Sequence, residues 1–354
     1  MNNWNEYLSS LGARRGSADD GARIADFGRS LSAADLAKGF VAILTDQDLI
    51  AVRGDDAATF LHSQLTNDVE HLDASQVRLA AYCTPKGRMQ ASFLMWRDSG
   101  AVYLQLPSEL RPALQKRLSM FVMRAKAKLE DATAAEGNQA VLGLGGQASQ
   151  AALEQHFGTL PATPYSKIDH AYGTLMRLGD AFGAPRYMWL TSEPTALPAL
   201  TILAANLALG GNDAWALSGI HAGVPQITAA TQEQFVPQMV NYELLNGVNF
   251  KKGCYPGQEI VARSQYLGKL KRRTTLVSID SLDVKAGQEV FDVADPGQPC
   301  GMIVNAAPNG AGGSDALVEM KLASIDQSEV RLGSAEGPAL RFLPMPYALD
   351  ALDL

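Results

Sequence analysis

The chain has 354 residues, of which 47% are hydrophobic and 19% are charged, a composition typical of a globular protein with two or three domains. Its net charge of −7 argues against general nucleic-acid binding, and no apolar stretch reaches the roughly 20 residues of a membrane-spanning helix. The first residues show neither the basic nor the apolar part of a secretory signal, so we expect a cytoplasmic protein that does not bind membranes.

The first part of the chain predicts an arm followed by an α+β unit. Residues 1–39 are expected to form an N-terminal arm, partly mobile, that opens with a short amphipathic helix. The apolar face of this helix comprises Trp4, Tyr7, Leu8 and Leu11. Residues 40–140 mix strands and helices without regular βαβ alternation, which favours an α+β fold. Strands are expected at 40–44, 49–52, 79–83, 90–96 and 102–106, and helices at 55–65 and 108–120.

Residues 141–272 are predicted to form a second, related α+β unit. It opens with Val141-Leu142-Gly143-Leu144-Gly145-Gly146-Gln147-Ala148, and this G-x-G-x-x-A pattern between a strand and a helix also occurs at dinucleotide sites. A related strand-to-helix turn occurs at 52–57, however, and no βαβ series follows. A weak internal duplication therefore explains the pattern better than a dinucleotide site does. A strand at 187–191 and a helix at 194–209 are expected next.

Residues 273–354 predict a small C-terminal β-barrel. Short apolar segments alternate with turns such as Asp295-Pro296-Gly297 and Pro308-Asn309-Gly310, a spacing typical of short antiparallel strands. The expected strands are 275–279, 289–291, 302–304 and 316–321.

The cysteines and histidines do not predict a disulfide framework or a metal site. Cys83, Cys254 and Cys300 lie far apart, are odd in number and form no C-x-x-C pair, which excludes the usual thiolate metal motifs. The five histidines also lack metal-binding spacing. We therefore expect no intrinsic metal.

One cysteine lies in a setting that favours a reactive thiol. In Lys251-Lys252-Gly253-Cys254-Tyr255-Pro256-Gly257-Gln258-Glu259, two lysines precede Cys254 and a predicted helix follows it. Nearby cations and a helix N-terminus both stabilise a thiolate and lower the pKa of the thiol. The alternative is an incidental half-buried thiol in a glycine-rich turn.

The surrounding segment is unusually basic for an acidic chain. Residues 251–273 contain seven basic residues and a single acidic one. Such a cluster indicates either a localised anionic ligand or a solvated basic face, and the sequence leaves both open.

The cysteine segment, together with Arg263, resembles the K-G-C-Y-x-G-Q-E-x-x-x-R signature of the YgfZ family, the folate-binding relatives of the glycine-cleavage T-protein, an aminomethyltransferase. The similarity extends in order over most of residues 45–350. The other matching stretches are 52–57, 60–69, 83–89, 222–225, 235–241 and 343–347.

The resemblance implies a T-protein-like α+β folate-binding fold, with two related halves and a small C-terminal β-barrel. It also implies a folate-dependent accessory protein for the assembly or repair of iron–sulfur clusters. The implied cofactor is tetrahydrofolate or a folate derivative. Partners would be iron–sulfur client enzymes or cluster-assembly proteins, with an indirect link to tRNA through clients that modify it.

The resemblance also implies site residues around the cysteine. Cys254 and Lys252 would form the catalytic pair, with Lys252 lowering the pKa of the thiol. Six residues would shape the loop: Gly253, Tyr255, Gly257, Gln258, Glu259 and Arg263. An alternative for Glu259 and Arg263 is an ordinary i,i+4 helix pair, which contributes about 0.3 to 0.5 kcal/mol.

Folate recognition needs an aromatic platform, polar groups for the pterin edge and cations for the tail. The implied set is Trp215, His221, Gln238, Asn241 and Arg263. Core packing of Trp215 and turn formation by Gln238 and Asn241 are the alternatives.

Two positions depart from the T-protein pattern and bear on catalysis. His221, in His221-Ala222-Gly223-Val224-Pro225, replaces an acidic residue, and a neutral histidine offers one donor and one acceptor where a carboxylate accepts twice. Pro85-Lys86-Gly87-Arg88 occupies the region of the T-protein aspartate that serves aminomethyl transfer. Because of these departures, a genuine aminomethyltransferase is the alternative and not the main expectation. A non-catalytic scaffold that binds tRNA or a partner through the basic segment is a further alternative.

Overall fold

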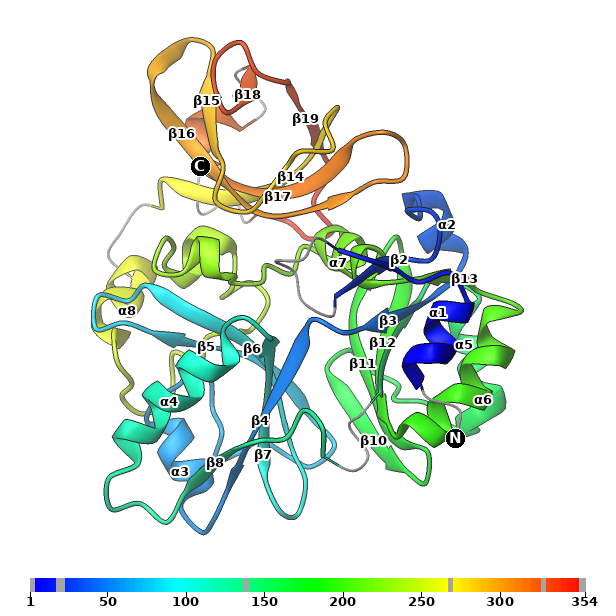
Figure 1. Cartoon of the computed structure of the whole chain (residues 1–354). Coiled ribbons are helices and arrows are strands. Elements are labelled where there is room, and N and C mark those ends of the chain that lie inside the picture. Colours follow the sequence, from blue (N-terminus) through cyan, green and yellow to red (C-terminus); the bar gives the residue numbers. More distant parts are fainter. Residues whose placement is uncertain (1–3, 17–22, 136–139, 267–269, 326–328, 350–354) are drawn as a thin grey trace.

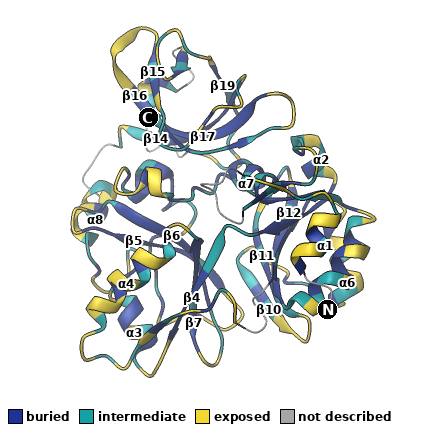
Figure 2. Ribbon diagram, viewed as in Figure 1, coloured by how far each residue is buried: buried dark blue, intermediate teal, exposed yellow. Residues whose placement is uncertain are grey.

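A computed structural model of the chain describes residues 4–16, 23–135, 140–266, 270–325 and 329–349. Three large β-sheets are arranged around a common centre, and helices lie on the outer faces of two of them (Figure 1); a fourth sheet has only two short strands. Buried residues concentrate in the strands and in the central region, whereas exposed residues lie on the outer helices and loops (Figure 2). The α+β class predicted from the sequence is confirmed.

The first sheet has five antiparallel strands in the order β5-β6-β7-β4-β8. Its outer helices are α3 (Ala57–His62) and α4 (Arg111–Val122), where Pro112 occupies the first turn and needs no N–H partner. The strands are buried along most of their length, which explains their nearly continuous apolar sequence. Their bounds are β4 (Gln47–Arg53), β5 (Val77–Cys83), β6 (Met89–Arg97), β7 (Val102–Pro107) and β8 (Lys128–Asp131).

The second sheet has six strands in the order β10-β11-β12-β9-β3-β13. Its strands are β3 (Phe40–Leu44), β9 (Ala140–Gly145), β10 (Ser166–His170), β11 (Gly173–Ala181), β12 (Ala184–Thr191) and β13 (Ala208–Gly210). The associated helices are α2 (Ala33–Lys38), α5 (Ser149–Phe157), α6 (Glu193–Ala204) and α7 (Asn212–His221).

The sheets do not follow the division predicted at residue 140. Strand β3, which the sequence places with the first unit, pairs with β9 and β13 of the second sheet. All five residues of β3 are buried, so the strand requires a sheet that is covered on both faces. A two-residue connection then carries the chain into β4 of the first sheet.

The N-terminal arm is docked in its described part. Helix α1 (Trp4–Ser10) buries Trp4 and Leu8 in the same apolar cluster as Leu200 and Leu203 of α6. A short hairpin follows, formed by β1 (Arg14–Arg15) and β2 (Ile24–Asp26). The predicted helix is therefore confirmed, and its apolar face explains why this segment is held in place. Residues 17–22 of the polar stretch lie outside the described residues.

The C-terminal unit is a curled sheet of six strands that forms a half-barrel, in the order β18-β15-β16-β17-β14-β19. The strands are β14 (Arg272–Ile279), β15 (Glu289–Asp292), β16 (Asp295–Pro308), β17 (Ser314–Lys321), β18 (Val330–Leu332) and β19 (Leu340–Leu343). Its own apolar core includes Val277, Ile303 and Val318. It lies above the junction of the other two sheets in Figure 1.

The segment after α7 returns to the first sheet, although the sequence predicts it within the second unit. Phe235 accepts a backbone hydrogen bond from Met89 (2.8 Å), and Glu233 donates one back (2.8 Å). Asn249 donates to the carbonyl oxygen of Thr66 (2.9 Å). The short helices η2 (Ala229–Thr231) and η3 (Pro237–Val240) belong to this segment, which ends in α8 (Gln258–Tyr266); η4 (Leu322–Ser324) follows β17.

The glycine pattern that also occurs at dinucleotide sites serves packing here. A Cβ on Gly143 would lie 2.3 Å from the Trp215 ring, and a Cβ on Gly145 would lie 2.6 Å from the Phe40 ring. Both glycines belong to β9, and both allow a large ring to lie directly against the strand.

Candidate functional site

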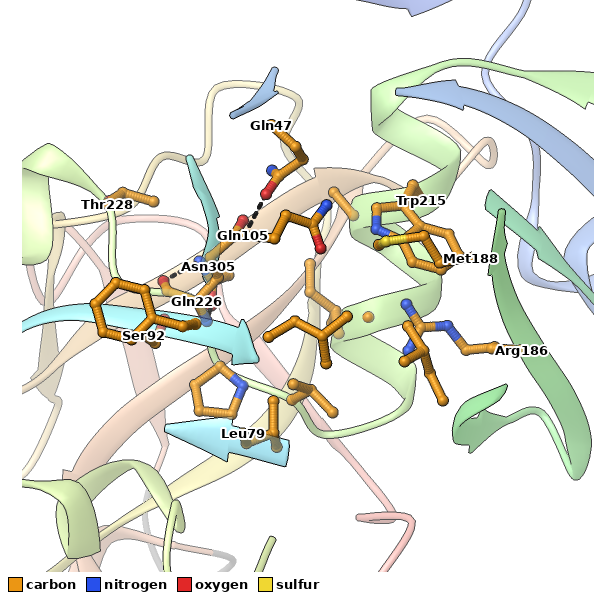
Figure 3. Close-up of a pocket in the computed structure, with 18 of the residues that line it drawn as sticks. Gln47, Leu79, Ser92, Gln105, Arg186, Met188, Trp215, Gln226, Thr228 and Asn305 are labelled. Carbon is orange, nitrogen blue, oxygen red and sulfur yellow. Dashed lines mark hydrogen bonds between the residues drawn. The ribbon is translucent and has the colours of Figure 1, made fainter. Parts of the chain in front are cut away.

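A central cavity of about 250 Å³ lies where the first sheet, the second sheet, α7 and the half-barrel meet (Figure 3). Residues from all of these elements line it, including Leu94, Leu178, Ile220 and Ala306. Most of the wall is apolar, with a few polar groups, as in typical small-molecule sites. The tertiary arrangement thus brings distant segments together around one ligand-sized space.

Three amide side chains connect the elements on one side of the cavity. Gln226 donates its backbone N–H to Asn305 Oδ1 (2.8 Å), and Asn305 Nδ2 donates to the Gln226 carbonyl oxygen (2.8 Å). Gln226 Nε2 also donates to Gln47 Oε1 (3.1 Å). The first sheet, the segment after α7 and the half-barrel are therefore joined at the cavity wall. Gln105 is buried and also lines the cavity.

Trp215 and Arg186 form the opposite side of the cavity. The Arg186 guanidinium lies over the Trp215 ring, 4.3 Å from the ring centre, a favourable cation–π geometry. Arg186 Nε donates to Ser218 Oγ (3.0 Å), and this hydroxyl donates to the Trp215 carbonyl oxygen (2.7 Å). Burial lowers the pKa of Arg186 to about 10, although Tyr165 and Asp180 act to raise it. Trp215 thus lies at the cavity, as expected for a cofactor-binding residue.

The other residues predicted for folate binding lie outside this cavity. His221 Nε2 pairs with Asp315 Oδ2 of β17 (2.7 Å), and its ring stacks near Phe182 with centres 4.5 Å apart. Burial opposes ionisation of Asp315, but hydrogen bonds, chiefly from His221, outweigh it and lower the pKa of the carboxyl. His221 therefore connects α7 to the half-barrel and does not face a ligand in the cavity.

Gln238 and Asn241 are fully buried near the start of the half-barrel. Gln238 Nε2 donates to the Val261 carbonyl oxygen of α8 (2.8 Å), and Asn241 Nδ2 donates to the Thr274 carbonyl oxygen of β14 (2.8 Å). Asn241 has a left-handed φ of 56°, which asparagine tolerates better than most residues. Both amides hold chain segments together and do not line the cavity.

The cysteine loop lies on the outer side of the first sheet and does not line the cavity. Cys254 is exposed, whereas Cys83 and Cys300 are buried. Burial raises the pKa of Cys83 to about 12 and also raises that of Cys300. The thiolate is the reactive form of cysteine, so the raised pKa values make the two buried thiols unreactive. Cys254 is the one accessible thiol in the described part of the chain.

Lys252 anchors the loop beneath Cys254. Its ammonium group donates to the carbonyl oxygens of His62 and Leu65, with 2.8 Å to the latter, just after α3, and lies 4.7 Å from the centre of the Tyr255 ring. Burial lowers the pKa of Lys252 to about 8, although the charges of Asp68, Cys254 and Glu70 act to raise it. The lysine therefore holds the loop and places a positive charge near the thiol.

The rest of the signature shapes the contact between the loop and the turn at 84–88. Gly257 has φ +83°, and a Cβ there would lie 2.4 Å from the Thr84 carbonyl oxygen, so only glycine fits. Tyr255 is buried, and Gln258 begins α8. Glu259 and Arg263 are exposed on α8, and no ion pair joins these two described side chains. The i,i+4 helix pair, the alternative considered for Glu259 and Arg263, therefore does not form between these two side chains.

Sequence reasoning missed His62 and Asp68, which lie beside the cysteine loop near Gly253 and Lys252. His62 Nδ1 lies 3.1 Å from Asp68 Oδ1, and its Nε2 lies 3.7 Å from the place that a Cβ on Gly253 would take. Burial opposes ionisation of Asp68, but hydrogen bonds from His71 outweigh it and lower the pKa of the carboxyl. Both residues fall within the stretch 60–69 that resembles the family, and this resemblance could have indicated that they belong to the site.

A short segment connects the cavity to the cysteine loop. Tyr242 lines the cavity, and its carbonyl oxygen accepts a hydrogen bond from Gly247 (2.8 Å). The carbonyl oxygen of Gly247 in turn accepts from Thr66 Oγ1 (2.7 Å), and Asn249 follows on the same strip of chain. Nine residues therefore separate the cavity residue Tyr242 from Lys252.

Comparisons with known proteins place this geometry in a family. No family model matches the chain. The chain is 33% identical over 236 residues to the tRNA-modifying protein YgfZ of Shigella boydii, covering 66% of this chain and 70% of that protein. It is 31% identical over 312 residues to the tRNA-modifying protein YgfZ of Klebsiella pneumoniae, covering 87% of this chain and 92% of that protein. The chain belongs to the YgfZ family.

The fold of this YgfZ-family chain is similar to that of a T-protein. The glycine cleavage system aminomethyltransferase T from Bartonella henselae superimposes with a TM-score of 0.77 at 16% identity, over 97% of this chain and 96% of that protein. The T-protein-like fold expected from the cysteine signature is therefore confirmed.

Two further features, a metal-binding group and a membrane-spanning helix, are absent among the described residues of this YgfZ-family chain. No group of three or more His, Cys, Asp or Glu side chains there is arranged to hold a metal ion. No helix among the described residues is long and apolar enough to cross a bilayer.

Proposed function

We propose that this YgfZ-family chain is a folate-dependent accessory protein that assists the assembly or repair of iron–sulfur clusters in client enzymes, including enzymes that modify tRNA. Cys254 is the residue that contacts the sulfur or cluster fragment, which is the substrate. The observation that carries the proposal is the separation of an exposed, lysine-anchored thiol from the central cavity within a T-protein-like fold.

The exposed thiol supports an action on partner proteins. A thiol inside the cavity would meet only the small molecule bound there, whereas Cys254 on the outer surface is accessible to a client. Lys252 orients the loop through two carbonyl oxygens, and its ammonium group interacts electrostatically with Cys254. His62 lies close to Gly253 and adds a second polar group beside the loop.

The cavity fits part of a folate. Its wall offers an aromatic side chain in Trp215, a cation in Arg186 and a buried amide in Gln105, the types of group that bind a flat heterocycle with a polar edge. Bound folate would supply one-carbon or redox chemistry or stabilise the fold. Tyr242 and the segment that follows would connect its binding to the cysteine loop.

Aminomethyl transfer is less well supported. Among the described residues that line the cavity there is no aspartate, glutamate or histidine, so no side chain there is suited to general acid–base chemistry on an amine at neutral pH. Formation of methylenetetrahydrofolate from an aminomethyl-lipoyl carrier would decide in favour of this activity.

A scaffold that binds tRNA through the basic segment is also less well supported. Arg272 pairs with Glu319, Arg273 pairs with Glu243 and Lys252 is partly buried. Lys251, Arg263 and Lys271 remain exposed, and Lys269 lies outside the described residues. Steep salt dependence of tRNA binding, unchanged in Cys254→Ala, would support the scaffold instead.

The proposal is tested by removing individual thiols. Cys254→Ala should abolish support of client iron–sulfur enzymes in cells depleted of the native protein, whereas Cys300→Ala should retain it. In the native protein, a thiol reagent should label one cysteine rapidly, and labelling should be lost in Cys254→Ala. The proposal fails if Cys254→Ala retains full client activity and the wild-type thiol labels with an apparent pKa at or above about 8.5.

The folate part is tested by calorimetry with tetrahydrofolate, which should bind at one site per chain. His221→Glu would not be informative, since it places a carboxylate beside Asp315 and away from the cavity.

A further inference from the structure

Arg186 is a buried cation without a counterion among the described residues. It lies on β12 and is 4% exposed. Its Nε bonds to Ser218 Oγ, but no ion pair involves its guanidinium in the described part of the chain. Asp180, which acts electrostatically on it, is paired with Arg177 instead.

This arrangement differs from that of the other buried arginine. Arg273 is as deeply buried as Arg186 and pairs with Glu243. A buried charge normally requires a partner, because removal from water is strongly unfavourable. The lowered pKa of Arg186 reflects that unfavourable burial. Arg186 therefore has a geometry that a bound ligand would complete.

The unpaired side of the guanidinium is directed toward the cavity (Figure 3). Ser218 and the Trp215 ring fix its Nε and its plane, so the terminal nitrogens have a defined orientation before a ligand arrives. One of them, Nη2, lies 3.6 Å from the place that a Cβ on Gly219 would take. Preorganised donors of this kind bind an acceptor with little further loss of entropy.

We propose that Arg186 determines the orientation of the ligand in the cavity by donating hydrogen bonds to the ring carbonyl oxygen of a reduced pterin. The inference rests on the proposed folate binding and adds the residue and the ligand atom.

Two observations favour the ring over the tail. The cavity, at about 250 Å³, is smaller than the roughly 300–1,000 Å³ of sites that enclose a whole drug-sized ligand, so it holds only part of a folate. The tail carries two carboxylates, and Arg186 is the only cation among the described residues that line the cavity. A carbonyl oxygen accepts through two lone pairs, so both terminal nitrogens of the guanidinium can donate to it.

The test compares three arginine variants by calorimetry and thermal unfolding. Arg186→Met removes the charge and keeps an unbranched apolar side chain, Arg186→Lys keeps the charge without the fork, and Arg341→Met removes an exposed arginine from the half-barrel as a control. Tetrahydrofolate affinity should fall about 10- to 100-fold in Arg186→Met, fall less in Arg186→Lys, and stay unchanged in Arg341→Met. Without ligand, Arg186→Met should melt within about 3 °C of wild type.

Two fragments identify the ligand atom. A tetrahydropterin without the tail should bind wild type and lose affinity in Arg186→Met by the same factor as tetrahydrofolate. The affinity of 4-aminobenzoylglutamate should be the same in both proteins. The reverse pattern overturns the assignment to the ring carbonyl.

Other outcomes separate this inference from the proposed function. If wild type binds tetrahydrofolate and Arg186→Met binds it equally well, the inference alone is overturned. A loss of binding together with a large drop in the melting temperature of unliganded Arg186→Met makes Arg186 a structural residue and also overturns it. If wild type does not bind tetrahydrofolate, the folate part of the proposed function fails and this inference fails with it.

Discussion

Two buried arginines should respond to different extents to the same substitution. Arg273 Nη1 donates to the Gln238 carbonyl oxygen (3.0 Å) and pairs with Glu243, whose side chain is 5% exposed. Arg273→Met leaves the Glu243 carboxylate buried without this partner, which destabilises a protein by about 3 to 5 kcal/mol. With an unfolding entropy of about 2.1 cal/mol/K per residue, the melting temperature should fall by about 4 to 7 °C.

Arg186→Met serves as the matched comparison. A pKa lowered from 12.5 to about 10 corresponds to about 3 kcal/mol of disfavoured charge, which the substitution removes. It also removes the bond to Ser218, about 1.5 to 3 kcal/mol, and the contact with Trp215, about 2 kcal/mol. The losses exceed the gain by about 0.5 to 2 kcal/mol, so the melting temperature should fall by only about 1 to 3 °C.

Thermal unfolding of the two variants, followed by circular dichroism at pH 7, checks this reasoning. The double variant Arg273→Met/Glu243→Leu should recover most of the lost stability, because both charges are then removed. If Arg273→Met melts like wild type, or if the double variant is less stable than Arg273→Met, the account of the buried pair is refuted.

Two further predictions concern the cysteine loop. Gly257→Ala requires a left-handed φ of +83° and places a Cβ 2.4 Å from the Thr84 carbonyl oxygen, so it should destabilise the protein by more than about 1 kcal/mol. Gly312→Ala, with φ +92° and no atom within 4 Å, should lose less in urea unfolding; equal losses would contradict the steric argument. Because burial lowers the folded-state pKa of Lys252 from 10.5 to about 8, the unfolded chain binds more protons between these values, and the contribution of Lys252 to stability rises with pH from about 8 to 10.5. Relative to wild type, Lys252→Met should therefore become progressively less stable across that range, and a constant difference between the two proteins would contradict this assignment.

Local patterns carried most of the information about the elements. The helix at Trp4, the strands before and after Pro85 and the short C-terminal strands follow from apolar periodicity and turn residues. The position of β3 did not, because a fully buried strand shows the same apolar run in either sheet. Strand pairing depends on contacts between distant segments, and local sequence does not encode them.

The folate residues illustrate the same limit. Trp215 lies at the cavity, but His221, Gln238 and Asn241 bond to the half-barrel or to α8. An amide in a turn looks identical in sequence whether it binds a ligand or a neighbouring carbonyl. Arg186, in contrast, lies in an ordinary strand with no motif around it. That no described residue forms an ion pair with it becomes visible only after β12, α7 and β11 are packed together.

The sequence by itself determined the family, the α+β class and the cysteine loop, because a contiguous signature with Cys254, Lys252 and Gly257 encodes a local conformation. Only the tertiary structure decided that this thiol lies outside the cavity and that Arg186 faces into it. The physical reason is that burial and charge pairing depend on which distant segments meet. Whether a thiol is accessible, or a cation can bind a ligand, depends on which other segments the fold packs against it.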